Sequence, residues 1–141
     1  MKVIPMEKAH LEKVAALSEQ LGYPVTIDEL SRRWVNLSSN ERHALLVCEE
    51  NDHTVGWVHV ELVEDLIEEE KAEIKAIVVD ENSRGNGVGR ALIEAAEKWA
   101  KTYRLHTIYL NCNILRTRTH KFYQRAGFRE YKTSLFFEKR V

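Results

Sequence analysis

The stretch that decides the fold reads Val79-Asp80-Glu81-Asn82-Ser83-Arg84-Gly85-Asn86-Gly87-Val88-Gly89-Arg90. It follows an apolar β-type run and opens an amphipathic helix. A helix N-terminus presents unpaired backbone N–H groups and a partial positive charge. Glycines let an anion approach those groups closely, because no Cβ intervenes. We therefore predict that this turn binds a phosphate or pyrophosphate, with Arg84 and Arg90 adding ionic contacts.

Two common phosphate-binding motifs do not fit this turn. A P-loop requires a Gly-Lys pair, which the chain lacks. A dinucleotide fingerprint, GxGxxG, requires a glycine where Arg90 or Leu92 stands. The pattern that is present, Arg84-x-x-Gly87-x-Gly89, resembles the R/Q-x-x-G-x-G/A signature of the GNAT superfamily of N-acetyltransferases. A turn that only reverses the chain is the alternative, and the concentration of glycines between a strand and a helix argues against it.

A second motif near the C-terminal end carries the same resemblance. Residues 119–128 read Thr-His-Lys-Phe-Tyr-Gln-Arg-Ala-Gly-Phe. One branch of the superfamily has A-H-x-F-Y-x-x-x-G-F, which this chain matches except for Thr119. The two motifs stand in the family's order, so the resemblance covers nearly the whole chain. It implies an α/β fold with a mixed, mostly antiparallel sheet of about seven strands and about four helices, in one domain over residues 1–141.

Composition agrees with a single globular domain of 141 residues. Lys and Arg total 21 and Asp and Glu total 22, a net charge of −1 that gives no broad basic surface for nucleic acid. No apolar run approaches the roughly 20 residues of a membrane span, and no signal peptide is visible at the N-terminus. Cys48 and Cys112 lie in no CxxC pair or His cluster, so we expect no metal site and a cytoplasmic protein with reduced thiols.

Hydrophobic periodicity and turn residues predict the order of the elements. A capping box, Thr26 with Glu29, marks the start of the second helix. The expected strands are 2–5, 43–50, 54–63, 72–79 and 107–112, with two more near Phe128–Tyr131 and Ser134–Glu138. The expected helices are 6–21, 26–36, 87–103 and 115–126.

The resemblance implies that acetyl-CoA is the cofactor and assigns residues to it. The backbone of Ile77–Val79 would bind the pantetheine arm like an added strand, with the Val79 N–H donating to the thioester oxygen. The turn would hold the pyrophosphate. The expected cofactor-binding residues are Ile77, Val78, Val79, Arg84, Gly85, Asn86, Gly87, Val88, Gly89 and Arg90.

Tyr123 matches the tyrosine that in many relatives protonates the departing thiolate of coenzyme A. A hydroxyl that donates to a thiolate makes it a better leaving group. The alternative is a packing tyrosine beside Phe122 and Phe128. Many relatives carry Asn seven residues before this Tyr, where Arg116 stands here, and Asn113 is out of register.

Acetyl transfer to an amine requires a base, because most alkylamines are protonated at pH 7. Glu73 is the first candidate, since Ala72-Glu73-Ile74 matches by position the Ala-Glu-Val of the histone-acetylating branch, where that Glu is the base. A surface charge at a strand start is the alternative for Glu73, and Glu61 is a second candidate base. Acidic residues crowd positions 61–70, which favours a cationic amine as substrate, although such runs are usually solvated loops.

We therefore predict an acetyl-CoA-dependent N-acetyltransferase that moves an acetyl group to a primary amine by direct attack in a ternary complex. The alternatives are a non-catalytic acyl-CoA-binding sensor and an acyltransferase that uses another acyl-CoA. Leu62-Val63 and Leu66-Ile67, flanked by acids, could form an exposed edge that pairs with a second subunit, and the resemblance implies a homodimer. Neither a nucleic acid nor a membrane is expected as a partner.

Overall fold

The computed structural model describes residues 1–141 and contains one five-stranded sheet with the strand order β1-β2-β3-β4-β5. The strands are β1 (Lys2–Pro5), β2 (His43–Glu50), β3 (His53–Val63), β4 (Lys71–Val79) and β5 (Ile108–Leu110). Strands β1 to β4 pair antiparallel, and β5 pairs parallel to β4. The predicted mixed, mostly antiparallel sheet is confirmed, but it has five strands rather than about seven.

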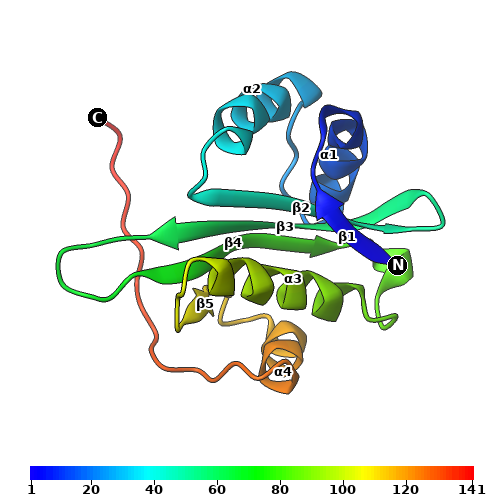
Figure 1. Ribbon diagram of the computed structural model, residues 1–141. Helices are drawn as coiled ribbons and strands as arrows, with labels where there is room; N and C mark the ends of the chain where they lie inside the picture. The colour runs from blue at the N-terminus through cyan, green and yellow to red at the C-terminus, as the bar shows by residue number, and fades with distance from the viewer. The chain divides into compact units, whose positions relative to one another are not determined.

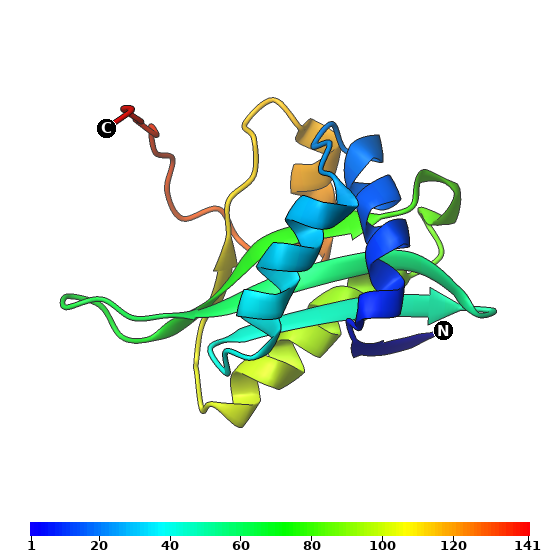
Figure 2. The same cartoon turned by 90° about the horizontal axis from the view of Figure 1, so that it is seen from above.

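Helices cover both faces of this sheet. Helices α1 (Leu11–Gln20) and α2 (Ile27–Ser38) lie on one face, and α3 (Val88–Thr102) lies on the other (Figure 1; Figure 2). Two short 3-10 helices, Lys8–His10 and Glu81–Ser83, precede α1 and α3. The fourth helix, α4, spans Thr117–Arg125, so the expected four α-helices are present.

The chain forms two compact units, Met1–Asn111 and Cys112–Val141. The whole sheet and the first three helices belong to the first unit, and α4 belongs to the second. In the first unit, a cluster of Leu11, Val14 and Val47 packs between the sheet and helices α1 and α2, with Trp34 and Trp57 at its edge. Trp34 is therefore a packing residue, and its Nε1 donates to the Met6 carbonyl at 3.1 Å.

Side chains alternate between the two faces along β3, as the pleat of a strand requires. Val58 and Val60 are fully buried. His59, which lies between these two valines, and Glu61, which follows Val60, are only partly buried. The odd-numbered residues Trp57, His59 and Glu61 therefore lie on one face of β3, which carries the polar groups of this strand.

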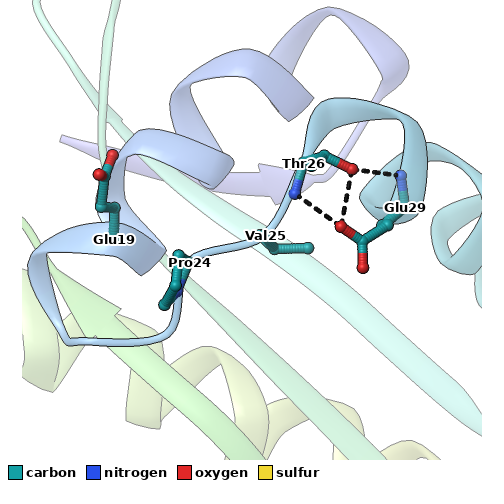
Figure 3. A pocket seen from close by; sticks show the side chains of 5 residues that line it. All are labelled: Glu19, Pro24, Val25, Thr26 and Glu29. Carbon is teal, nitrogen blue, oxygen red and sulfur yellow. Dashed lines mark hydrogen bonds between the residues drawn. The ribbon is translucent and has the colours of Figure 1, made fainter.

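The start of α2 follows the sequence prediction. The Thr26 hydroxyl accepts a hydrogen bond from the Glu29 N–H at 3.1 Å, and a Glu29 carboxylate oxygen accepts from the Thr26 N–H at 3.3 Å. Figure 3 shows this capping box beside a shallow depression that Glu19, Pro24 and Val25 also line. The box satisfies backbone donors that the first helical turn leaves unpaired.

The two C-terminal strands predicted near Phe128–Tyr131 and Ser134–Glu138 are wrong. Both segments lack strand pairing in the structure. The Phe128 N–H instead donates to the Tyr123 carbonyl at 3.0 Å, and Gly127 has a φ of +98°, so this segment closes the end of α4. Apolar residues with strand propensity form a strand only where a partner supplies a ladder.

Candidate acetyl-CoA site

The glycine-rich turn adopts a conformation that needs its glycines. Gly85 and Gly87 have φ values of +84° and +86°, in the left-handed region that side chains disfavour, and Gly87 is the N-cap of α3. A Cβ at Gly85 would meet no atom within 4 Å, and one at Gly87 would meet only the end of the Met1 side chain at 4.0 Å. The turn therefore presents backbone N–H groups at a helix N-terminus with open space beside them, which suits a phosphate.

A residue that the sequence analysis missed ties this turn to α1. The Gln20 side-chain oxygen accepts from the Glu81 N–H at 3.0 Å, and its nitrogen donates to an Asp80 carboxylate oxygen at 3.4 Å. Asp80 in turn accepts from the Asn82 N–H at 3.1 Å. Gln20 lies 61 residues before Glu81, and no local pattern marks such a contact.

We expect Gln20→Ala to weaken the binding of CoA about fivefold while the protein stays folded. Each hydrogen bond lost contributes about 1 kcal/mol net, which corresponds to a severalfold change in an equilibrium constant. Titration calorimetry with CoA measures the change. Glu19→Ala, one residue earlier on α1, is the control and should bind CoA as the unmodified chain does; equal affinity in both variants would show that the Gln20 contacts do not support the turn.

One edge of β4 has no strand partner next to the turn. β5 pairs with β4 only at Ala72, Glu73 and Ile74. On the other edge, Val79 lies opposite Gly56, and the bond from the Asp80 N–H to the Val55 carbonyl at 2.8 Å marks this as a non-hydrogen-bonded pair. The N–H and C=O of Val79 therefore point to the unpartnered edge.

The same alternation assigns the backbone groups of Ile77 to that edge and those of Val78 to β3. Ile77 and Val79 thus offer hydrogen-bonding groups that an extended, amide-containing arm such as pantetheine can use. The backbone groups of Val78 pair with β3, so of the three residues only Ile77 and Val79 have backbone groups at the unpartnered edge.

Two carboxylates meet on the polar face of the sheet. Glu61 and Glu73 lie opposite each other in the β3–β4 register. Lys75 joins them, since its Nζ lies 3.2 Å from Glu73 Oε2 and 3.5 Å from Glu61 Oε2. Partial burial opposes the charge of Lys75, but the hydrogen bond with Glu73 and the charges of both carboxylates raise the pKa of its ammonium overall. The structure thus brings the two candidate bases together and shows that they can hold an ammonium group.

Two histidines adjoin these carboxylates. His43 Nδ1 and His59 Nε2 are 2.9 Å apart, from neighbouring strands. Burial and the nearby His43 lower the pKa of His59 to about 4, so its imidazole is neutral at pH 7. No local sequence pattern marks this contact, because the two positions are 16 residues apart and meet only through the β2–β3 register.

Tyr123 lies in the second unit, on α4. Its ring makes edge-to-face contacts with Phe122 and Phe128, with centroid distances of 5.4 and 5.8 Å. Burial and the neighbouring Cys112 raise the pKa of the Tyr123 hydroxyl to about 12, against an opposing effect of Arg116. The hydroxyl is therefore protonated at neutral pH, as a proton donor must be, and the ring also packs as the alternative interpretation expected.

Other residues near this motif have local roles. His120 Nε2 is 2.8 Å from the Asn113 carbonyl oxygen, and the Asn113 side chain accepts from the Leu115 N–H at 2.9 Å. Arg116 is the N-cap residue of α4. Burial raises the pKa of the Cys112 thiol, which does not favour a nucleophilic thiolate.

None of the helices is long and apolar enough to cross a membrane. No group of three or more His, Cys, Asp or Glu side chains is arranged to hold a metal ion.

Comparison with known proteins places the chain in a family. Residues 11–128 match the model of the acetyltransferase (GNAT) family. An uncharacterised N-acetyltransferase of Methanocaldococcus jannaschii is 33% identical over 96 residues, which are 67% of this chain and 42% of that relative's length. The chain therefore belongs to the GNAT acetyltransferase family. The predicted class, N-acetyltransferase, and the predicted cofactor, acetyl-CoA, agree with this membership.

One sequence relative and two solved structures of similar fold have names that state an activity. An aminoglycoside N(6')-acetyltransferase of Stenotrophomonas maltophilia is 24% identical over 119 residues, covering 82% of this chain and 78% of the relative. The crystal structure of an aminoglycoside 6'-N-acetyltransferase of Acinetobacter haemolyticus superposes with a TM-score of 0.88 at 18% identity, covering 100% of this chain and 99% of that one. The structure of the aminoglycoside N-acetyltransferase AAC(6')-Iy in complex with a bisubstrate analogue of CoA and acetylneamine has a similar fold, with a TM-score of 0.89 at 21% identity, covering 99% of this chain and 98% of that one.

Proposed function

We propose that this chain transfers an acetyl group from acetyl-CoA to a primary amine by direct attack in a ternary complex, and that residues 1–141 act as one catalytic domain. The observation that carries the proposal is the glycine turn at the start of α3, open on one side and adjoining the unpartnered edge of β4. The family match spans both compact units, which supports one domain.

The chain's own groups would bind the two ends of the cofactor separately. The turn from Arg84 to Arg90 holds the pyrophosphate through backbone N–H groups and the positive end of α3. The N–H and C=O groups of Ile77 and Val79 bind the amide-containing arm along the edge of β4. The Val79 N–H donates to the thioester oxygen, where negative charge develops during attack. The cofactor supplies the activated acyl group.

The proton transfers fall to Glu73 and Tyr123. Glu73 holds the acceptor's ammonium group and takes its proton, so that the neutral amine can attack. Support comes from Lys75, whose ammonium group already contacts Glu73 and Glu61. Tyr123 protonates the leaving thiolate, supported by a hydroxyl that stays protonated at neutral pH. Orientation of both reactants supplies the rest of the rate.

The substrate we propose is a small cationic amine. The paired carboxylates Glu61 and Glu73 favour a positive charge at the polar face of the sheet. The acidic hairpin between β3 and β4, which projects from the sheet in Figure 1, adds to that field. The activity of the aminoglycoside-acetylating relatives is consistent with this class. A cytoplasmic location remains part of the proposal, as does a homodimer.

Thermal unfolding with acetyl-CoA tests the cofactor site. A ligand at 100 times its Kd adds about 2.7 kcal/mol to the free energy of unfolding, which raises Tm by several degrees in a chain of this size. ATP and NAD are the controls, because they share phosphate groups with CoA but lack pantetheine. A shift with acetyl-CoA alone, followed by turnover of an amine from a panel, supports an enzyme. A shift without turnover of any amine would favour a non-catalytic sensor, and no shift would overturn the proposal.

A further inference from the structure

The two histidines of the polar face have no part in the proposed transfer, although they adjoin its carboxylates. His43 lies opposite Glu61 in the β2–β3 register, and Glu73 lies opposite Glu61 in the β3–β4 register. His59 is two residues before Glu61 and therefore points to the same side of β3. The four side chains form a titratable patch that crosses three strands.

The contact between the two rings constrains their protons. A hydrogen bond between His43 Nδ1 and His59 Nε2, at 2.9 Å, needs one N–H and one lone pair. The pair therefore shares a single proton between the facing nitrogens. Each ring keeps one outer nitrogen, Nε2 in His43 and Nδ1 in His59. Such a pair can accept a proton at one outer nitrogen and release another at the opposite one.

Glu73 needs a route by which to lose a proton. Its side chain is only 13% exposed, and its carboxylate is bound to Lys75. A proton taken from a substrate by this carboxylate must leave before the next turnover. Glu61, across the strand pair, is 30% exposed and lies between Glu73 and the histidines in the register.

We propose that the His43–His59 pair carries the proton given up by the acceptor amine from the Glu61–Glu73 carboxylates to solvent. The inference rests on the proposed acetyl transfer and adds a proton route to it. The ammonium loses one proton to the carboxylates, and His59 Nδ1 gains it through water. The proton between the rings then moves from His59 to His43, and His43 Nε2 releases one proton to solvent. No net charge remains on the pair, but its two tautomers are reversed, and reorientation of the rings has to restore them before the next turnover.

The charges around the pair agree with this role. Burial, His43 and Lys75 disfavour a charged His59, and Glu61 favours it. His59 is therefore neutral at rest and able to accept a proton, while the adjacent carboxylate stabilises the positive charge as it passes. Arg42, next to His43, is engaged by Glu64 across the strand pair, with Arg42 Nη1 2.6 Å from Glu64 Oε1.

The test measures the pH dependence of turnover in His59→Phe and His43→Phe, which keep an aromatic ring. Acetyl-CoA is saturating, and the amine is the fastest of neamine, spermidine and a lysine peptide. At pH 6.5 we expect kcat to fall about tenfold or more, within the range for a group that handles protons. The loss should shrink toward pH 9.5, because more of the amine then arrives without its proton. His53→Phe, at the other end of β3, is the matched control and should behave as the unmodified chain.

A second measurement separates proton transfer from packing. In His59→Ala, added imidazole should raise kcat in proportion to its concentration, and it should leave the unmodified chain unaffected. Each variant is first checked for its Tm and for its Tm shift with acetyl-CoA, and if His59→Phe does not fold, His43→Phe decides. A loss of kcat that is equal at every pH and does not respond to imidazole would overturn the inference, as would unchanged kcat. If the unmodified chain acetylates none of the amines, the proposed function itself fails, which is a separate result.

Discussion

Tyr123→Phe is expected to lower kcat by about 100-fold or more, the lower end of what a positioned general acid contributes, and to leave the Kd for CoA unchanged. The substitution removes only the hydroxyl, which we propose protonates the departing thiolate. The ring and its contacts with Phe122 and Phe128 remain, so the packing of α4 is kept. Steady-state kinetics with acetyl-CoA and binding of CoA by calorimetry measure the two quantities separately.

The pKa of Tyr123 fixes the pH dependence of this effect. Burial, together with Cys112, raises the pKa to about 12 from an ordinary value of 10.0, against the opposing effect of Arg116. The hydroxyl therefore stays protonated through neutral and moderately alkaline pH, and the ratio of the two kcat values should be constant from pH 6 to 9. Stability linked to this group is complete below pH 10 and is lost as pH rises toward 12.

Tyr131→Phe provides the control, because Tyr131 lies in the same unit but outside the motif. It should keep the kcat of the unmodified chain. Equal kcat in Tyr123→Phe and Tyr131→Phe would leave Tyr123 with its packing role alone, which its two aromatic contacts already show.

Local signals in the sequence predicted the elements whose causes are themselves local. The Thr26–Glu29 capping box starts α2 where it was expected, and the glycines before Val88 start α3 within one residue of the predicted position. β2 has the predicted bounds, His43–Glu50. In each case a turn or cap beside a periodic run decides the boundary, and all of these groups lie within a few residues of one another.

The parts that failed depend on partners distant in the sequence. Ser134–Glu138 has the composition of a strand, but Leu135, Phe136 and Phe137 are at least 80% exposed and no strand pairs with them. Likewise, the contact of His43 with His59 and that of Gln20 with Asp80 and Glu81 follow from register and packing. A single sequence contains no local trace of such contacts. The glycine turn could therefore be found from the sequence, but the His43–His59 contact and the hydrogen bonds of Gln20 could not.

Gly56→Ala is the substitution from which we expect the largest loss of stability. A Cβ at this position in β3 would lie 2.8 Å from the Val78 carbonyl oxygen, 3.0 Å from Val88 Cγ1 and 3.1 Å from Leu92 Cδ1. Val88 and Leu92 are almost fully buried and have little room to move. Overpacking of this kind costs about 1–3 kcal/mol, which should lower Tm by roughly 3–10 °C.

The identity of the clashing atoms makes a sharper test possible, because the closest one belongs to the backbone of β4. Relief of the Val88 contact alone, in the double variant Gly56→Ala/Val88→Ala, should not restore stability, since the Val78 carbonyl oxygen would still lie too close. A double-mutant cycle on the free energy of unfolding measures this coupling. A large favourable coupling would show that the side chains dominate the clash and that β4 does not have to shift. If instead β4 shifts, the backbone groups of Ile77 and Val79 move with it, and Gly56→Ala should also weaken CoA binding. The added methyl group itself lies on the α3 face, away from the edge of β4 that we propose binds CoA.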